Sequence, residues 1–298
     1  MKVKERIFKV IYITVVTLAA LVVVAALLPV FVCDQFRIGG VSMEPTLRTG
    51  DHVFVNKLLM GARIYTKYDF SDPVMESFRM PGLRKIRPGD VAVFNYPYGR
   101  DGDRIEFRIN YVYAKRCIGC PGDTVSIVDG YYRNSRYPGM TIGSAMMQST
   151  LSDTPDHLLE AQGVYLPAMP FRPEYGWTIR DFGPLYVPRE GGRVAIDTSS
   201  VALYSKIIEF ETGQLPETRD GKVYIGGAEV SEYEFRKDYC FFGGDNVLNS
   251  RDSRYFGFVP EEYITGIATR ILFSRDPYTG RMDWSRFLRR IGQADLPL

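Results

Sequence analysis

Histidine is scarce in this chain: its 298 residues include only His52 and His157. His52 stands in an alternating apolar stretch and His157 in a polar one, which favours structural roles for both. Neither lies near an obvious nucleophile in the sequence, so a Ser-His-Asp triad has little support. If the chain is a serine hydrolase, lysine is the remaining candidate base.

Cysteine is also sparse, with four residues at positions 33, 117, 120 and 240, which fits no dense disulfide framework. The Cys117-x-x-Cys120 spacing suggests a redox pair or half of a zinc site. No second pair of this kind exists, so a four-ligand zinc site would need unrelated partners. We favour small core cysteines, or an incidental disulfide on the oxidising side of a membrane. The sequence predicts no metal and no cofactor.

Neither sign of charge is in clear excess: the chain has 37 basic and 35 acidic side chains, and its net charge is +2. That balance gives no electrostatic footprint for nucleic acid, which we exclude as a partner. Charge is missing altogether from the 23 positions between Val10 and Val32. A helix of that length covers roughly 35 Å and crosses a hydrocarbon core of about 30 Å.

Two observations favour a retained anchor over a cleaved signal peptide. The apolar run is longer than the ~7–15 residues of a signal peptide, and it ends at Leu28–Cys33 without a small-x-small site. Basic residues precede the run at positions 2, 4, 6 and 9, whereas only Arg37 closely follows it. This bias predicts a cytoplasmic N-terminus over residues 1–9, a transmembrane helix over 10–32 and an outward-facing remainder.

The rest of the chain predicts a mostly β fold. Short alternating apolar runs are broken by glycine, proline, aspartate and asparagine, with strands expected at 51–57, 90–94, 108–118, 239–242 and 266–274. This pattern favours an antiparallel sheet or partial barrel. Residues 34–125 and 237–275 form the predicted catalytic core, and 126–236, rich in proline, glycine and tyrosine, form an inserted accessory domain with a short helix at 157–162.

The C-terminal tail, residues 276–298, carries Trp284, Phe287, Leu288 and Ile291 at helical spacing among arginines. We expect an amphipathic basic helix over 281–293. Two readings stay open for it: contact with a membrane surface, or docking on the protein body.

Ser42 and Lys115 are the candidate catalytic residues. Ser42 follows Gly39 and Gly40 in a loop that allows close approach of a substrate, although loop serines of this kind are usually structural. Lys115 stands in a predicted strand whose alternation puts it on one face with Tyr113 and Cys117. Burial there would lower the pKa of the ammonium by about 2 units, at a cost of roughly 2.7 kcal/mol, and give a usable base near neutral pH.

Four motifs in order resemble the conserved boxes of bacterial type I signal peptidases, the Ser-Lys dyad serine proteases also called leader peptidases. They are Ser-Met-x-Pro-Thr-Leu at 42–47, Arg-Pro-Gly-Asp-Val-x-Val-Phe-x-x-Pro at 87–97, Lys-Arg-x-x-Gly-x-Pro-Gly-Asp at 115–123, and Gly-Asp-Asn-x-x-x-Ser-x-Asp-Ser-Arg at 244–254. Four boxes in this order behind an apolar span are a specific signal. The resemblance is loose over 126–236.

The resemblance implies an endopeptidase on the outer face of the inner membrane, which removes signal peptides with small residues at positions −1 and −3 from exported preproteins. It implies Ser42 as nucleophile and Lys115 as general base of an acyl-enzyme mechanism, on an enzyme in contact with membrane lipid. It also implies supporting roles for six other residues: Gly40 at the oxyanion hole, Ser250 on the lysine, Asp252 and Arg254 as an ion pair, and Met43 and Pro45 at the substrate.

The chain departs from the family pattern at several positions, including Gly243, where Met is common, and the unusual Cys117-x-x-Cys120. Gly40 stands where many Gram-negative relatives carry a serine that donates to the oxyanion, which leaves more of that role to the backbone N–H of Ser42. Val247-Leu248 replaces the usual Arg-Asp pair in the last box. These departures and the large insert keep two alternatives open: a specialised Ser-Lys processing peptidase with one dedicated substrate, and a non-catalytic membrane-anchored binding homologue.

Overall fold

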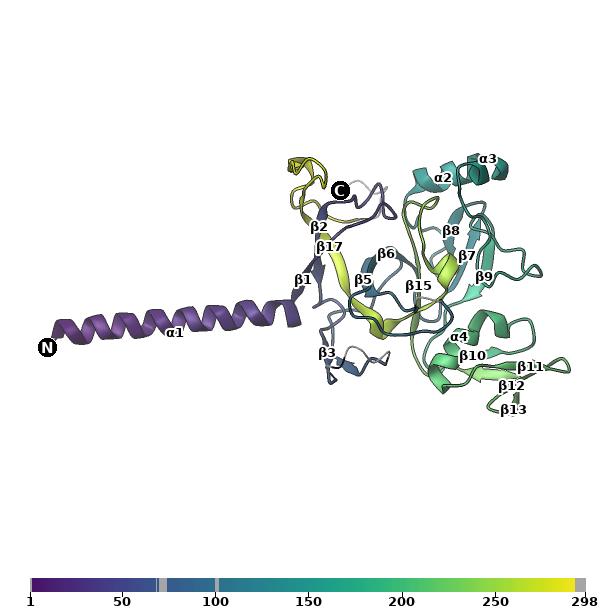
Figure 1. The fold of residues 1–298 in the computed structure, drawn as a ribbon, viewed down its shortest axis with the longest axis horizontal. Coiled ribbons are helices and arrows are strands. Elements are labelled where there is room, and N and C mark those ends of the chain that lie inside the picture. Colours follow the sequence, from purple (N-terminus) through teal and green to yellow (C-terminus); the bar gives the residue numbers. More distant parts are fainter. Residues whose placement is uncertain (1, 68, 70–73, 100–101, 293–298) are drawn as a thin grey trace.

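The computed structural model describes residues 2–67, 69, 74–99 and 102–292. Helix α1 (Lys2–Phe31) projects from a β-rich body (Figure 1). From Lys4 to Phe31 it is long and apolar enough to cross a membrane, with a mean hydropathy of 2.8 and no part buried against the protein. Such an exposed apolar surface is unfavourable in water. The predicted apolar helix over 10–32 is confirmed.

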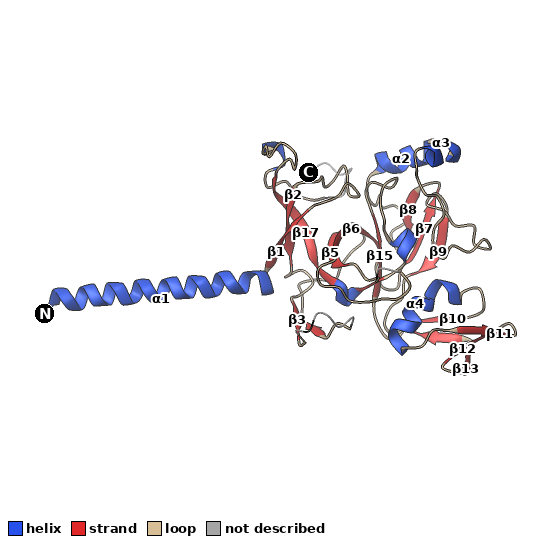
Figure 2. Ribbon diagram, in the orientation of Figure 1, coloured by secondary structure: helices blue, strands red, loops and turns tan. Residues whose placement is uncertain are grey.

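Seven antiparallel strands form the main sheet, in the order β1-β2-β17-β5-β6-β15-β16 (Figure 2). Their bounds are β1 (Cys33–Arg37), β2 (Asp51–Asn56), β5 (Val91–Asn95), β6 (Val112–Gly119), β15 (Tyr239–Gly243), β16 (Val259–Pro260) and β17 (Ile264–Ser274). The long strand β17 shifts register against both β2 and β5. Such bulges increase local twist and let the sheet curl.

The predicted strands are confirmed, with one shortened. The strand expected over 108–118 begins at Val112, because residues 108–111 form a turn in which the Tyr111 N–H donates to the Arg108 carbonyl (3.2 Å). Alternation in β2 buries Val53 and Val55, whereas every residue of β5 is buried. A central strand covered on both faces has this pattern, and β5 separates two apolar clusters.

The smaller cluster contains the residues that hold the start of the body together. Met43 and Leu47 pack there with Val53 and Val55 of β2 and with Val91 and Val93 of β5, and each is at most 2% exposed. The larger cluster covers the other face and extends into the segment between β6 and β15.

That segment adds further short elements. It contains β7 (Thr124–Val128), β8 (Tyr131–Asn134), α2 (Ala145–Asp153), α3 (Asp156–Ala161), β9 (Phe182–Tyr186), β10 (Arg193–Ala195), α4 (Val201–Thr212), β11 (Glu217–Arg219), β12 (Lys222–Ile225), β13 (Ala228–Val230) and β14 (Glu232–Glu234). Helix α3 confirms the short helix expected at 157–162. The segment shares the larger core with the main sheet: the Phe182 ring lies 5.5 Å from the Phe241 ring, and Tyr204 stacks on Phe258 at 5.9 Å.

The remaining elements are short. Strands β3 (Arg63–Tyr65) and β4 (Ser77–Arg79) form a hairpin, α5 (Ser253–Phe256) follows the last sequence box, and two 3₁₀ turns cover Glu261–Tyr263 and Trp284–Arg286. Figure 1 places the β3–β4 hairpin and the C-terminal segment at the end of the body from which α1 extends.

The expected C-terminal helix is wrong for the described residues 281–292. Only Trp284–Arg286 form a helical turn, and Arg290 continues as an isolated bridge to Arg270 on β17. The reason is Arg286, which helical spacing assigned to a polar face but which lies buried and bonded to Asp51. Trp284 remains 71% exposed. Residue 293 lies outside the described residues.

Candidate active site

The loop that carries Ser42 joins β1 to β2 and is anchored by its apolar residues. The Leu47 N–H donates to the Met43 carbonyl (2.9 Å) and the Glu44 N–H to the Val41 carbonyl (3.0 Å), so the loop is a compact set of turns. Met43 and Leu47 lie in the smaller core with 1% and 0% exposure. Ser42, next to a buried anchor, stays half-exposed and is held in one place.

Lys115 lies opposite Ala92 in the β5–β6 ladder and its side chain points at Ser42. Lys115 Nζ donates a hydrogen bond to Ser42 Oγ. The ammonium also lies 5.3 Å from the centre of the Tyr113 ring, on the strand face that the sequence assigned to it. The structure therefore brings together the two residues proposed from the sequence as nucleophile and base.

Burial sets the protonation of Lys115, which is 4% exposed. Desolvation lowers the pKa of its ammonium to about 8; the attraction of Asp252 opposes this fall, and the repulsion of Arg254 adds to it. The fall expected from the sequence was about 2 units, close to this result. A substantial fraction of neutral amine is present near physiological pH, as a general base requires.

Asp252 and Arg254 form the predicted ion pair, fully buried beside the dyad. Arg254 Nε and Nη2 donate to the two carboxylate oxygens of Asp252, both at 2.8 Å, and Arg254 Nη1 donates to the Val247 carbonyl (3.0 Å). Burial raises the pKa of the Asp252 carboxyl, but Arg254 and the hydrogen bonds outweigh it and hold the pKa below its usual value. A bidentate pair satisfied in this way is a rigid support.

The last sequence box also holds the serine loop directly, a contact that the sequence reasoning missed. The Asn246 N–H donates to the Ser42 carbonyl (3.1 Å) and Asn246 Nδ2 to the Val41 carbonyl (3.2 Å). Gly244 permits this approach, because a Cβ there would lie 2.5 Å from the Ser42 carbonyl oxygen. The Gly-Asp-Asn motif was the available signal for this contact.

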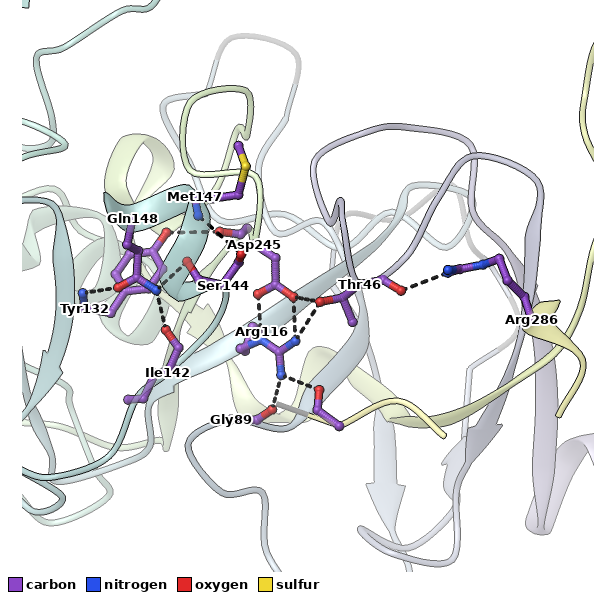
Figure 3. Close-up of polar contacts among 12 residues, drawn as sticks. Thr46, Gly89, Arg116, Tyr132, Ile142, Ser144, Met147, Gln148, Asp245 and Arg286 are labelled. Atoms are coloured by element: carbon purple, nitrogen blue, oxygen red, sulfur yellow. Dashed lines mark hydrogen bonds and ion pairs between the residues drawn. The ribbon is translucent and has the colours of Figure 1, made fainter. Parts of the chain in front are cut away.

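A second buried ion pair, between Arg116 and Asp245, was also missed. Arg116 Nε donates to Asp245 Oδ1 (2.6 Å) and Arg116 Nη2 to Asp245 Oδ2 (2.5 Å). Thr46 Oγ1 donates to the same carboxylate (2.5 Å), and Arg286 Nη2 donates to the Thr46 carbonyl (2.9 Å). Figure 3 shows this chain of contacts running from β6 through Asp245 to the serine loop and the C-terminal segment.

Ser250 does not make the contact implied for it. Its buried hydroxyl lies beside the Asp252 carboxylate, whose pKa it helps to lower, and it packs against Gly244, where a Cβ would lie 2.1 Å from Ser250 Oγ. Ser250 is thus placed in the supporting loop without a bond to Lys115.

A groove of about 600 Å³ opens over the dyad. Its walls are the loop from Phe36 to Met43, the start of β6, and Asn249 and Arg251. Gly40 lies in this wall, and a Cβ at that position would meet only open space. Of the two residues expected at the substrate, Met43 lines the groove but buries its side chain in the core, and Pro45 lies outside the lining.

The two histidines have structural surroundings. His52 stacks on Phe273 with ring centres 4.2 Å apart and its Nδ1 contacts Gln35 Nε2, whereas His157 is exposed on α3. Within the described residues, no cluster of three or more histidine, cysteine or acidic side chains could hold a metal ion.

Comparison with known proteins finds one family. The family model for "Signal peptidase, peptidase S26" matches residues 10–273. The curated signal peptidase I of Pseudomonas aeruginosa is 31% identical over 50% of this chain and 49% of that protein, so this match spans about half of its length. The signal peptidases I of Buchnera aphidicola (subsp. Baizongia pistaciae) and Aquifex aeolicus are 24% and 26% identical over 83% and 82% of this chain and 71% and 77% of theirs.

One solved structure, a signal peptidase I from Enterococcus faecalis, aligns with 63% of this chain and 100% of that chain at 19% identity. Its TM-score is 0.30, too low to bear on the fold.

Proposed function

The chain belongs to the signal peptidase family, peptidase S26, and on that basis we propose that Ser42 and Lys115 are the dyad with which this membrane-anchored serine endopeptidase removes signal peptides from preproteins. The observation that carries the proposal is the contact between Lys115 Nζ and Ser42 Oγ in a groove that can admit a peptide. Because the pKa of the buried lysine is lowered, Lys115 can accept the hydroxyl proton of Ser42 in this contact.

The proposed reaction is acyl transfer. Neutral Lys115 accepts the hydroxyl proton of Ser42 as Ser42 Oγ attacks the scissile carbonyl carbon, and the resulting ammonium returns that proton to the leaving amine. Water, deprotonated by the same amine, then attacks the acyl-enzyme and frees Ser42. Asp252 and Arg254 act by holding the loop around the dyad, and we assign Ser250 to the same support.

We assign the oxyanion hole to backbone. Gly40 has no side chain that could donate a hydrogen bond. The backbone N–H of Ser42 therefore stabilises the negative charge that develops on the carbonyl oxygen.

We propose a preference for small residues at positions −1 and −3 of the signal peptide. Support comes from Ala114 and Met43, which line the groove beside the dyad and whose side chains are largely covered by the core. We expect this part of the groove to accept only small substrate side chains. Pro45 stiffens the turn after the nucleophile and is assigned an indirect part in binding.

We propose a single orientation of the chain in the membrane. Lys4, Arg6 and Lys9 precede the apolar run of α1, which favours a cytoplasmic N-terminus and a catalytic body on the outer face of the inner membrane. A substrate that is held in the same bilayer by its own apolar segment meets the groove at high effective concentration. Lipid is thus a proposed partner of α1.

The test is cleavage of a preprotein with an Ala-x-Ala site by the purified full chain in detergent. The account expects cleavage after the last alanine, its loss in Ser42→Ala, and its retention in Ser205→Ala, a matched serine outside the groove. No cleavage by folded wild-type protein would contradict the function, and cleavage that survives Ser42→Ala would contradict the assigned nucleophile. A panel of unrelated preproteins separates a general peptidase from a dedicated one, because only the general enzyme cleaves most of them.

A further inference from the structure

Three of the four cysteines gather at one place that the proposed reaction does not use. Cys117 on β6 and Cys240 on β15 are fully buried on neighbouring strands, and Cys120 stands in the turn after β6. All are free thiols, and Cys117 Sγ lies 3.6 Å from Cys120 Sγ. The side chains of this pair already point toward each other.

The pair differs from ordinary core cysteines because one member can be reached from outside. Cys120 is partly exposed and lines a cavity of about 710 Å³. Basic side chains of Lys85, Arg136 and Arg189 stand in the wall together with acidic ones. A small disulfide reagent in this cavity can therefore approach Cys120, whose Sγ donates to the Ile86 carbonyl (3.4 Å), whereas Cys117 is covered by the core.

We propose that Cys117 and Cys120 form a reversible dithiol–disulfide site, oxidised by a low-molecular-weight disulfide that enters this cavity. The site is independent of peptide cleavage, because neither cysteine lines the groove at Ser42.

The chemistry is thiol–disulfide exchange in two steps. The Cys120 thiolate attacks one sulfur of the reagent, forms a mixed disulfide and releases one thiolate. The sulfur of Cys117 then attacks Cys120 Sγ, the second thiol of the reagent leaves, and the proton of Cys117 passes to the released thiolates or to water. Two protein thiols are oxidised and one disulfide is reduced to two thiols.

The order of the steps follows from the surroundings of each thiol. Burial raises the pKa of Cys117, so this thiol stays protonated and covered until the mixed disulfide is beside it. Cys117 is also fixed by the sheet, since its N–H donates to the Asp90 carbonyl and its carbonyl accepts from the Gly89 N–H, both at 2.8 Å. Closure to a bonded distance of ~2.05 Å therefore moves Cys120 and its turn.

Cys240 is the competing partner, because its thiol is hydrogen-bonded to the Cys117 thiol. The difference between Cys240 and Cys120 is access from outside. Cys240 is fully buried, whereas Cys120 is partly exposed and lines the cavity, so a reagent reaches Cys120 first.

The test uses the full chain in detergent, equilibrated with oxidised glutathione, blocked with a maleimide and digested with trypsin. Cleavage after Arg116 and Arg133 puts both cysteines in one peptide, residues 117–133, separate from Cys240 in 238–251 and Cys33 in 10–37. We expect the 117–133 peptide to lose two hydrogens and to take no maleimide, and dithiothreitol to restore two maleimide additions.

Cys120→Ser is the variant and Cys33→Ser the matched control. The loss of two hydrogens should disappear in Cys120→Ser and persist in Cys33→Ser, with preprotein cleavage by both variants showing that they are folded. Three results would overturn the proposal: unmodified thiols in 117–133 after oxidation, a crosslink from this peptide to 238–251, or stoichiometric zinc bound to the thiols of the purified protein.

Discussion

Lys115 Nζ donates to Ser42 Oγ although the two residues are 73 positions apart in the sequence. The contact depends on two different supports. Lys115 is placed by the β5–β6 ladder, whereas Ser42 is placed by the buried side chains of Met43 and Leu47 and by hydrogen bonds from Asn246. The dyad thus joins a rigid strand to an anchored loop.

Lys115→Met is expected to abolish cleavage and to stabilise the folded protein. The buried ammonium destabilises the fold at pH 7 because its pKa falls from 10.5 to about 8 on folding, which corresponds to about 3 kcal/mol. The lowered pKa means that this cost is complete below pH 8 and disappears as pH rises toward the unfolded value of 10.5. Urea unfolding at several pH values measures it, with the exposed Lys85→Met as control. Equal stability of Lys115→Met and wild type at pH 7 would contradict the burial argument.

Gly40→Ser is expected to fold normally and to raise kcat, on the order of ten-fold, because it adds a hydroxyl donor near the oxyanion. A Cβ at position 40 meets open space, so no packing is lost. Gly39→Ser is the matched control, since a Cβ is also accommodated there, one residue further from the nucleophile. Single-turnover kinetics on a preprotein measure the effect, and a slower Gly40→Ser enzyme with unchanged unfolding would refute a backbone-only hole.

Arg254→Met is expected to cost about 3–5 kcal/mol of stability, because it leaves the Asp252 carboxylate buried without its partner. Loss of cleavage should accompany the change, since the loop that supports the dyad loosens. The exposed pair Lys222–Glu229 supplies the control: Glu229→Gln should leave the unfolding midpoint unchanged. An Arg254→Met protein as stable as wild type would show that the pair is not a scaffold.

Arg286→Met is expected to destabilise the protein and to slow cleavage, although position 286 is more than 240 residues from the nucleophile in sequence. Arg286 is 2% exposed, donates to Asp51 at 2.8 and 2.5 Å and to the Thr46 carbonyl at 2.9 Å, and so ties the C-terminal segment to the serine loop. The exposed Arg289→Met should change neither property. Thermal unfolding and kcat, measured together, check this; an Arg286→Met enzyme with wild-type values would exclude the tie.

The sequence predicted the parts of the molecule that local pattern determines. Alternation in β2 and the uncharged run of α1 identified a strand and a membrane helix, and the ordered boxes singled out Ser42, Lys115 and the Asp252–Arg254 pair. The contact of Arg116 with Asp245 joins residues 129 positions apart, and no local pattern encodes such a partner.

The C-terminal helix was wrongly predicted for the same reason, because its long-range contacts are not encoded by local pattern. Helical spacing of Trp284, Phe287 and Ile291 predicted an amphipathic helix, but the buried bond of Arg286 to Asp51 and the bridge of Arg290 to β17 hold this segment against the sheet with a single helical turn. Tertiary contacts outweighed a weak helical preference.

The pH dependence of kcat/KM for preprotein cleavage tests the central claim most directly, because it reports the ionisation of the base in the free enzyme. If Lys115 acts as a neutral amine, kcat/KM rises with pH through an apparent pKa of about 8 and falls ten-fold per unit below it. A profile that is flat from about pH 6 to 9, in an enzyme that stays folded throughout, would contradict Lys115 as the general base.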